Sequence, residues 1–373
     1  MTRREDRPQA AELMPSETPV RFVAEDGTRV DRHAGYAEPA LDRLRTAYRL
    51  MVRGRRFDAQ ATALTKQGRL AVYPSSAGQE ACQIASALTL RPDDWLFPTY
   101  RDSVALVSRG LEPGEVLTLL RGDAHCGYDP AAARVAPQCT PLATQTLHAT
   151  GLAHALARQG KDSVVLALIG DGATSEGDFH EALNFAAVFD APVVFFVQNN
   201  GYAISVPLEK QSAAPALAYK GVGYGVRSEQ VDGNDAVAVL AVLDAAVEHA
   251  RRGGGPMLVE AHTYRMDAHT NADDATRYRD AEEVERWRAA DPVRRLETYL
   301  TGREALSAKD IEEFRAEAEE FAVTVRAAMN AEPVLDPLSM FDHVYAEPTR
   351  QLVAQRALVA AELEAADRET QEA

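Results

Sequence analysis

Cysteine is scarce in this sequence, and long apolar runs are absent. The 373 residues contain three cysteines, an odd number with no Cys-x-x-Cys pair, so neither a disulfide framework nor a zinc site is indicated. No apolar run approaches the ~18 residues that a membrane-spanning helix requires. The first ten residues, MTRREDRPQA, have no apolar centre like that of a signal peptide. We therefore expect a cytoplasmic protein without a membrane partner.

Basic residues are also in deficit. Lys and Arg number 40 against 56 Asp and Glu, which gives a net charge of −16. This charge balance argues against a nucleic-acid partner, because proteins that bind nucleic acids carry a patch of basic residues on their surface. The acidity is more typical of a soluble surface than of a docking surface for a basic partner, although both interpretations stay open. The length is enough for about two domains, or for one large α/β unit with helical additions.

The most informative stretch runs from residue 164 to 202 and predicts a strand–helix–strand unit. Short apolar runs at 164–169 and 193–197 are bounded by Gly and Pro, as in strands buried on both faces of a parallel sheet. Between them, residues 175–178 predict a capping-box start for an amphipathic helix. Polar residues follow each strand, and ligands bind at the carboxyl ends of strands in open α/β sheets.

These polar ends predict a site for a diphosphate and a metal ion. Residues 170–173 read Gly-Asp-Gly-Ala, and residues 199–202 read Asn-Asn-Gly-Tyr. Glycines let the backbone approach a ligand closely, and the start of a helix offers free N–H groups to an anion. Asp171 and the amide oxygen of Asn200 are hard donors that suit Mg bridging to phosphate. Gly-Asp-Gly alone is more often a plain turn, but the two motifs together are specific.

GDG followed some thirty residues later by NN resembles the thiamine diphosphate motif. From about residue 40 to 345 the sequence resembles the alpha subunit of the thiamine-dependent component of 2-oxo acid dehydrogenase complexes, with bacterial branched-chain and pyruvate members most similar. The resemblance implies an α/β fold with a mostly parallel sheet flanked by helices. We expect a flexible arm at 1–38, the thiamine diphosphate-binding domain at 39–280, and a helical region at 281–373 packed on the same unit.

The resemblance also implies which residues hold the cofactor. Asp171, Asn200 and the carbonyl of Tyr202 would bind Mg, and Leu142 would support the bent cofactor. Residues 140–145 resemble the family's Ser-Pro-Leu-Ala-Thr-Gln, in which some members hold a potassium ion; a capped helix start without an ion explains the same residues. The potassium positions are Pro141, Thr144 and Gln145. The implied cofactor contacts are Thr99, Tyr100, Arg101, Thr140, Leu142, Gly170, Asp171, Gly172, Ala173, Asn200, Tyr202, Ala203, Ile204, Arg265 and His269.

Two cationic segments complete the expected site. Tyr100 and Arg101 suit phosphate oxygens, although Tyr-Arg-Asp alone is more often a surface helix start. His269 follows a predicted strand at 256–261, with Arg265 four residues earlier. The resemblance implies that Arg265 supports the phosphates and that His269 touches them and serves in acyl transfer to lipoamide, so His269 is the candidate catalytic acid–base residue. Thr270 replaces the regulatory serine of the animal enzymes, so control by a dedicated kinase is unsupported.

Elsewhere the pattern predicts further helices. Apolar spacing indicates one helix at 39–56, a second at 57–70 and a third at 80–90. Residues 231–235 predict a turn and a helix start, and residues 307–310 predict a capping box ahead of a helix with an apolar stripe. Residues 122–138 are expected to form a loop. They also depart from the family pattern, which leaves open the substrate contacts expected there.

The expected function is that of the alpha subunit of a branched-chain 2-oxo acid dehydrogenase (3-methyl-2-oxobutanoate dehydrogenase), which decarboxylates a 2-oxo acid oxidatively and transfers the acyl group to lipoamide of the acyltransferase component. Pyruvate dehydrogenase is the alternative. A nicotinamide oxidoreductase is more distant, because the glycine spacing does not fit a dinucleotide turn. A scaffold subunit without chemistry is the non-catalytic alternative. Since a separate beta chain supplies the family's activating glutamate, the resemblance implies a heterotetramer of two alpha and two beta chains.

Overall fold

The computed structural model describes residues 9–30, 35–123, 125–331 and 336–372. The chain divides into two compact units, Met1–Met329 and Asn330–Ala373, each of which is described by itself. The strands in the described residues are β1 (Trp95–Phe97), β2 (Val165–Gly170), β3 (Val193–Asn199), β4 (Tyr202–Ala203), β5 (Val206–Pro207), β6 (Arg227–Asp232) and β7 (Met257–His262). The helices are α1 (Ala10–Leu13), α2 (Leu41–Lys66), α3 (Glu80–Leu88), α4 (Ser103–Ser108), α5 (Pro113–Arg121), α6 (Pro130–Ala133), α7 (Thr144–Arg158), α8 (Gly177–Phe189), α9 (Tyr219–Gly223), α10 (Ala236–Arg251), α11 (Ala281–Ala289), α12 (Pro292–Gly302), α13 (Ala308–Asn330) and α14 (Arg350–Glu372).

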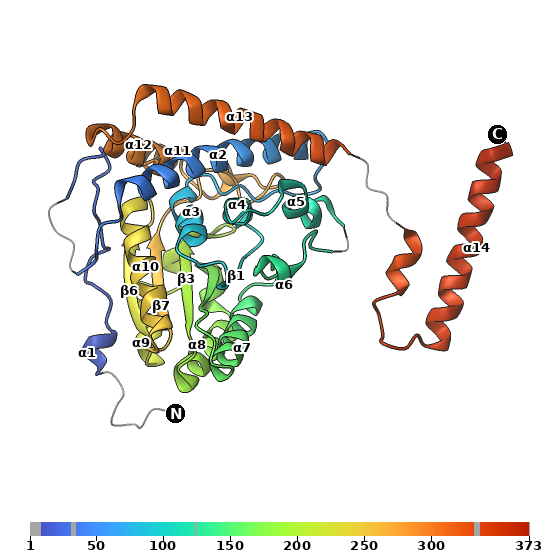
Figure 1. Ribbon diagram of the computed structural model, residues 1–373, viewed down its shortest axis with the longest axis horizontal. Helices are drawn as coiled ribbons and strands as arrows, with labels where there is room; N and C mark the ends of the chain where they lie inside the picture. The colour runs from blue at the N-terminus through green and yellow to red at the C-terminus, as the bar shows by residue number, and fades with distance from the viewer. Residues whose placement is uncertain (1–8, 31–34, 124, 332–335, 373) are drawn as a thin grey trace. The chain divides into compact units, whose positions relative to one another are not determined.

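The first unit is built on a five-stranded sheet in the order β1-β2-β3-β7-β6 (Figure 1). Each neighbouring pair in this sheet is parallel. The predicted strands at 164–169, 193–197 and 256–261 are therefore confirmed as β2, β3 and β7, within a residue or two at their ends. Because all strands run the same way, their carboxyl ends meet at one edge of the sheet, as the predicted fold class requires.

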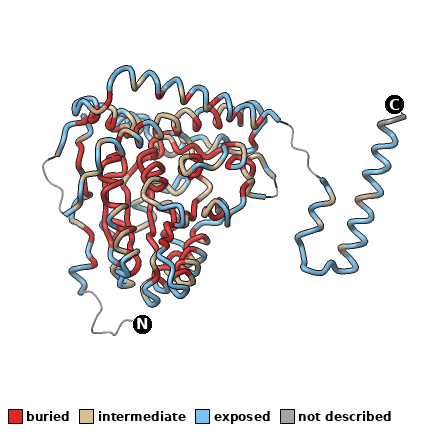
Figure 2. The backbone as a smooth tube through the Cα atoms, viewed as in Figure 1, coloured by how far each residue is buried: buried red, intermediate tan, exposed pale blue. Residues whose placement is uncertain are grey.

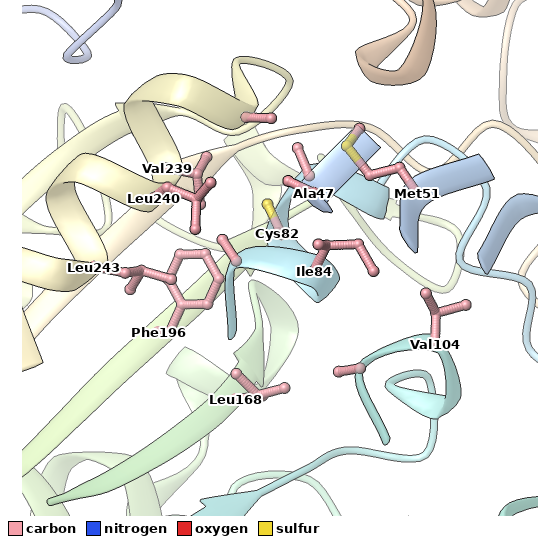
Figure 3. Close-up of a cluster of buried hydrophobic side chains, with 14 of the residues drawn as sticks. Ala47, Met51, Cys82, Ile84, Val104, Leu168, Phe196, Val239, Leu240 and Leu243 are labelled. Carbon is pink, nitrogen blue, oxygen red and sulfur yellow. The ribbon is translucent and has the colours of Figure 1, made fainter. Parts of the chain in front are cut away.

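Alternate side chains of the central strands enter two separate cores. On one face, Leu168 and Phe196 pack with α3 and α10 and with the more distant α2, as Figure 3 shows. On the other face, Ile169 and Phe195 pack against α7 and α8. Burial of each such side chain contributes about 1.5–3 kcal/mol, so both layers of helices are fixed on the sheet. The buried residues concentrate along the strands and the inner faces of these helices (Figure 2).

Helix α2 corrects one prediction. We expected two helices, at 39–56 and 57–70, but residues Leu41–Lys66 form one continuous helix. Gly54 lies near the expected break without interrupting the helix, because it packs against the side chain of Val104 on α4. A Cβ at Gly54 would lie 2.5 Å from Val104 Cγ1. The glycine therefore permits close packing of two helices instead of ending one.

Of the two predicted capping boxes, one is confirmed and one is wrong. At the start of α13, Ser307 Oγ accepts from the N–H of Asp310 at 3.2 Å, and Asp310 Oδ2 accepts from the N–H of Ser307 at 2.9 Å. At the start of α8 no such pair forms. A 3₁₀ helix over Gly172–Ser175 uses that segment, and Glu176 becomes the cap residue without a side-chain hydrogen bond.

The described part of the expected N-terminal arm is anchored along the sheet edge. The N–H of Val20 donates to the carbonyl of Gln230 at 2.9 Å, and Phe22 and Val23 are buried. Asp235 Oδ2 accepts from the N–H groups of Phe22 and Val23, each at 2.7 Å. These contacts cover the polar strand β6, which we did not predict. Residues 1–8 and 31–34 of the arm lie outside the described residues.

Residues 122–138 are not entirely a loop. They include the short helix α6, and isolated parallel bridges join Val135 to Leu96 and Cys139 to Thr99. The N–H of Ala136 donates to the carbonyl of Leu96 at 2.8 Å. The segment therefore continues the sheet beyond β1, because the outer edge of that short strand still has free peptide groups.

We expected a helical region at 281–373 packed on the same unit; the compact first unit extends to Met329 and so includes α11, α12 and most of α13. Ion pairs join α13 to α2, among them Arg45–Asp310 at 2.6 Å and Arg56–Glu319 at 2.8 Å. The second unit contains a 3₁₀ helix at Pro337–Phe341 and the largely exposed α14. Within the described residues, no helix is long and apolar enough to cross a membrane.

Candidate active site

A cavity of about 410 Å³ lies at the carboxyl ends of β1, β2 and β3 and beside the loop that follows β7. Its wall brings together nearly all of the predicted cofactor contacts, although they are spread over 170 positions of sequence, from Thr99 to His269. Of the predicted residues, Arg265 and Thr144 do not line the cavity; Arg265 lies directly behind the wall, where it contacts His269 and Ile204, and Thr144 precedes the lining residue Gln145. The lining residues among those predicted are Thr99, Tyr100, Arg101, Thr140, Pro141, Leu142, Gln145, Gly170, Asp171, Gly172, Ala173, Asn200, Tyr202, Ala203, Ile204 and His269.

Oxygen donors meet where β2 and β3 end. Asp171 and Asn200 are both buried, and both line the cavity together with Tyr202. Asp171 Oδ2 accepts a hydrogen bond from Gln211 Nε2 at 2.7 Å, and among the described residues no cation lies within salt-bridge distance of this carboxylate. Burial raises the pKa of Asp171, an effect that the Gln211 bond opposes. A buried carboxylate beside an amide oxygen, with no cation to balance it, fits a divalent ion such as Mg.

The two strand ends approach so closely that a glycine is needed between them. A Cβ at Gly172 would lie 2.7 Å from the Cβ of Ala203, which follows the Asn-Asn pair. Tyr202 is held from the other side, because its hydroxyl donates to Glu283 Oε2 on α11 at 2.8 Å. The Gly-Asp-Gly motif is therefore required by packing as well as by access to a ligand.

Two arginines converge at the same cavity without a counter-charge. Arg101 donates to the carbonyls of Ser75 at 2.7 Å and His269 at 3.1 Å. Arg265 is fully buried and donates to the carbonyl of Ile204 at 2.9 Å. In the part of the chain that the structure describes, neither guanidinium has a carboxylate within salt-bridge distance. Burial, and then the charge of Arg101, lower the pKa of Arg265. Two such cations fit an anionic ligand with several oxygens, such as a diphosphate.

Both arginines also contact one nitrogen of His269. Arg101 Nη2 lies 3.0 Å and Arg265 Nη1 lies 2.7 Å from Nδ1 of the imidazole. Guanidinium groups only donate, so Nδ1 must accept and the proton of the neutral ring resides on Nε2. Burial and the two positive charges lower the pKa of His269 to about 4. His269 is therefore neutral at pH 7 and presents an N–H group as its free donor.

Two apolar side chains remain exposed beside these polar groups. Leu142 is 44% exposed and Ile204 is 57% exposed, and both line the cavity. Ile204 has φ of +56°, and Ala143, next to Leu142, has φ of +63°. Left-handed backbone is costly for a β-branched residue, and such strain gathers at ligand sites. The exposed side chains fit an apolar ring system bound beside the charged end of the cavity.

The residues predicted to bind potassium do not all line the cavity. Thr144 Oγ1 lies 3.4 Å from Asp178 Oδ2. Gln145 Nε2 donates to the carbonyl of Leu168 at 2.8 Å, while its buried Oε1 has no hydrogen-bond partner in the structure. The carbonyl of Pro141 accepts from Cys139 Sγ at 3.1 Å. Among the described residues, Gln145 Oε1 is thus a buried side-chain oxygen of this set without a hydrogen-bond partner.

The model of the dehydrogenase E1 component family matches residues 48–334, more than half of the chain. The chain belongs to the dehydrogenase E1 component family. As a member of this family it is an oxidoreductase, and the family implies thiamine diphosphate as the cofactor. The residues that surround the cavity fit that cofactor, because they combine cationic groups, oxygen donors and apolar side chains in one space.

Similar proteins include alpha subunits of two named dehydrogenases. The 3-methyl-2-oxobutanoate dehydrogenase subunit alpha of Mycobacterium tuberculosis is 46% identical over 349 residues, which cover 94% of this chain and 95% of that protein. The pyruvate dehydrogenase E1 component subunit alpha of Acholeplasma laidlawii is 38% identical, with 85% and 93% covered. The corresponding subunit of Staphylococcus aureus is 41% identical, with 67% and 68% covered. An alpha subunit implies a beta subunit as its partner.

Sequence reasoning missed several residues of this E1 site. Gln79 and Gln198 line the cavity but were not among the predicted contacts. Gln211 touches Asp171 directly. Gln198 could have been recognised, because a glutamine inside the buried run of β3 requires a polar partner. Gln79 lies 121 positions from Asn200, and only folding brings it to the site. Gln211 follows the Asn-Asn-Gly-Tyr motif closely, but the motif itself does not show that its amide reaches Asp171.

Proposed function

We propose that this E1 chain is the alpha subunit of a branched-chain 2-oxo acid dehydrogenase that acts on 3-methyl-2-oxobutanoate. The observation that carries the proposal is that Arg101 and Arg265, which have no carboxylate within salt-bridge distance among the described residues, lie at and directly behind the wall of the cavity that the Asp171 and Asn200 side chains also line. The substrate assignment is supported by the 46% identity to the Mycobacterium tuberculosis subunit over nearly the full length of both chains.

In this proposal different residues bind different parts of the cofactor. Asp171, Asn200 and the carbonyl of Tyr202 hold Mg, and the arginines hold the diphosphate. The bulky side chain of Leu142 supports the cofactor's bent shape, with Ile204 beside it. When bound, thiamine diphosphate supplies a nucleophilic carbon for the 2-oxo group and an electron sink for decarboxylation.

His269 is the proposed acid–base residue for acyl transfer to the lipoyl group of the acyltransferase component. Its Nε2–H is available to donate, since Nδ1 is engaged by two arginines. The pKa of about 4 keeps the ring neutral, so it donates without adding a third positive charge beside Arg101 and Arg265. A potassium ion at Pro141, Thr144 and Gln145 belongs to the same proposal, supported by the unpaired Gln145 Oε1.

The proposed assembly is a heterotetramer of two alpha and two beta chains. The beta chain supplies the glutamate that activates the cofactor, so the alpha chain alone is inactive. Substantial decarboxylation by the purified single chain would contradict this assembly.

Pyruvate is the second candidate substrate, because two similar alpha subunits are pyruvate dehydrogenase components. Co-expression with the beta subunit, thiamine diphosphate and Mg allows kcat/KM to be compared for 3-methyl-2-oxobutanoate and pyruvate. We expect at least tenfold preference for the branched acid. Preference for pyruvate would change the substrate assignment but leave the proposed reaction unchanged. Absence of cofactor binding would overturn the proposal.

A further inference from the structure

The proposed metal site needs one particular end of the Asn200 side chain. An asparagine amide has an oxygen at one end and an NH₂ group of similar size at the other. Only the oxygen can bind Mg. Burial alone does not choose between the two orientations, so hydrogen-bond partners around Asn200 must do so.

The choice begins at Asp102, a fully buried residue in the wall of the cavity. Its Oδ2 accepts from the N–H of Thr99 at 2.6 Å and from Thr99 Oγ1 at 2.7 Å. Its Oδ1 accepts from Gln83 Nε2 at 2.6 Å and from Gln198 Nε2 at 2.7 Å. A carboxylate surrounded by four donors can only accept, so it fixes the NH₂ ends of both glutamines toward itself.

The orientation then passes along a chain of amides. With its NH₂ end on Asp102, Gln198 must turn Oε1 toward α3, where it accepts from Gln79 Nε2 at 3.3 Å. Gln79 in turn presents Oε1 to Asn200 and accepts from its Nδ2 at 3.1 Å. Because Nδ2 of Asn200 is engaged by Gln79, the other end of the amide, Oδ1, faces away from Gln79. It accepts from the N–H of Tyr202 at 3.4 Å.

We propose that Gln79 is a positioning residue that orients the Asn200 amide so that Oδ1 faces the bound metal ion. The inference rests on the metal site in the proposed function. Rotation of the amide by a half turn would place Asn200 Oδ1 against Gln79 Oε1, so that two acceptors would meet and a buried hydrogen bond would be lost. Gln79 thereby biases the side chain toward the orientation that binds metal before the metal arrives.

Gln83 provides a matched control one helical turn away. Gln83 is a buried glutamine of α3, whereas Gln79 is the residue before the first turn of this helix. Like Gln79, Gln83 donates from Nε2 to Gln198 Oε1, at 3.2 Å, and in addition it donates to Asp102. Its Oε1, however, accepts from the N–H of Ala105 at 3.0 Å. Gln83 neither contacts Asn200 nor lines the cavity, so loss of its amide removes comparable hydrogen bonds without releasing the metal ligand.

The test measures Mg affinity by calorimetric titration of the chain assembled with its beta subunit, at saturating thiamine diphosphate. We expect Gln79→Met to raise the Kd for Mg about tenfold and Gln83→Met to change it less than twofold, while both variants lower the melting temperature. Gln79→Glu keeps an acceptor toward Asn200 and is expected to bind Mg no more weakly than the wild type. Equal Mg affinity in Gln79→Met and Gln83→Met, or tenfold weaker binding in Gln79→Glu, would overturn the inference.

A second experiment distinguishes loss of the Asn200 orientation from a general disturbance of the site. Asn200→Asp has oxygen at both ends, so orientation ceases to matter, and adding Gln79→Met to this variant should not weaken Mg binding further. An additional tenfold loss there would show that Gln79 acts in some other way. Failure of the wild-type assembly to bind Mg with thiamine diphosphate would overturn the proposed function itself, whereas normal wild-type binding with an unaffected Gln79→Met overturns this inference alone.

Discussion

His269 shows how the two arginines determine the properties of a single side chain. A histidine beside a carboxylate becomes a better base, but here Arg101 and Arg265 both donate to Nδ1 and burial adds to their effect. The ring is thereby fixed as the Nε2–H tautomer and kept neutral. The same two cations that suit a diphosphate therefore also define the donor that His269 offers.

The depressed pKa of His269 predicts a specific dependence of stability on pH. Between the ordinary histidine pKa near 6.5 and about 4, the unfolded chain binds a proton at this position that the folded chain does not, so stability falls as pH decreases through this window. We expect His269→Asn to lose less of its free energy of unfolding than the wild type between pH 7 and 4.5, by about 1–2 kcal/mol. Urea unfolding across this range measures the difference.

Arg265→Met provides the matching control, because it leaves His269 in place and removes one of the charges that lower its pKa. Its loss of stability on acidification should lie between those of the wild type and His269→Asn. Parallel pH profiles for all three proteins would contradict the assignment of a neutral, depressed His269.

At the scale of secondary structure, Gly54 is the point at which α2 packs closely against the side chain of Val104 on α4. Ala has a better helix propensity than Gly by about 1 kcal/mol, so Gly54→Ala would stabilise an isolated helix. In this fold the new Cβ would lie 2.5 Å from Val104 Cγ1, and the β-branched valine cannot rotate away easily. We expect Gly54→Ala to lower the free energy of unfolding by about 1–3 kcal/mol. The double variant with Val104→Ala should recover part of the loss, whereas an additive result in urea unfolding would contradict close packing as the cause.

A buried carboxylate joins α2 to two loops of the site. Asp58 is buried, and its Oδ1 accepts from Tyr73 Oη at 3.0 Å and from the N–H of Ser76 at 2.7 Å, while its Oδ2 lies 2.7 Å from Ser75 Oγ. Ser75 Oγ also lies 2.8 Å from Asp267 Oδ2. One hydroxyl hydrogen cannot serve both carboxylates, so the arrangement is best satisfied when Asp58 is protonated and donates to Ser75. Burial raises the pKa of Asp58 to about 6.

The raised pKa of Asp58 changes stability with pH in the opposite direction to the lowered pKa of His269. Between about pH 4 and 6 the folded chain retains a proton that the unfolded chain releases, so Asp58 makes stability decrease as pH rises. We expect Asp58→Asn, which resembles the protonated acid, to be more stable than the wild type at pH 8 by about 1–3 kcal/mol and to differ little at pH 4. Urea unfolding at the two pH values tests this, and a variant less stable at pH 8 would contradict it.

The elements that could be predicted from sequence are those with local signals. β2, β3 and β7 are short apolar runs with clear boundaries, and the Ser307–Asp310 capping box lies within four consecutive residues. β6 could not be predicted, because its polar residues find hydrogen-bond partners in segments distant in sequence, among them an N-terminal segment more than 200 positions away. The single helix α2 was missed because the reason for Gly54 is a neighbour, Val104, that lies 50 positions later.

The same distinction applies to the site. The motifs identified Asp171 and Asn200 because both sit at strand ends next to recognisable glycines. Gln79 and Asp58 act through contacts with partners that are distant in sequence, and no local pattern marks them. The residues of the proposed metal site can thus be recognised from a sequence motif, whereas the residue proposed to orient one of them is revealed only by the tertiary fold.

At the scale of the whole molecule, the residues of the cavity suit the diphosphate end of the cofactor better than its rings. Its charged groups, Arg101, Arg265 and Asp171, suit the diphosphate and its metal ion. The apolar Leu142 and Ile204 remain 44% and 57% exposed. In the proposed assembly the rest of the cofactor is enclosed only when the beta subunit is present. The isolated chain should therefore recognise the anionic end of the ligand more than the whole of it.

This argument predicts how affinity changes on assembly. For the isolated chain in the presence of Mg, we expect the Kd values for inorganic pyrophosphate and thiamine diphosphate to differ by less than about tenfold, since the strong contacts are ionic. After assembly with the beta subunit, thiamine diphosphate should bind at least about 100-fold more tightly than pyrophosphate, because its rings then become buried. Arg101→Met should weaken both ligands to a similar degree in the isolated chain. Calorimetry with the two ligands makes the comparison, and strong preference for thiamine diphosphate by the isolated chain would mean that this subunit alone encloses the rings.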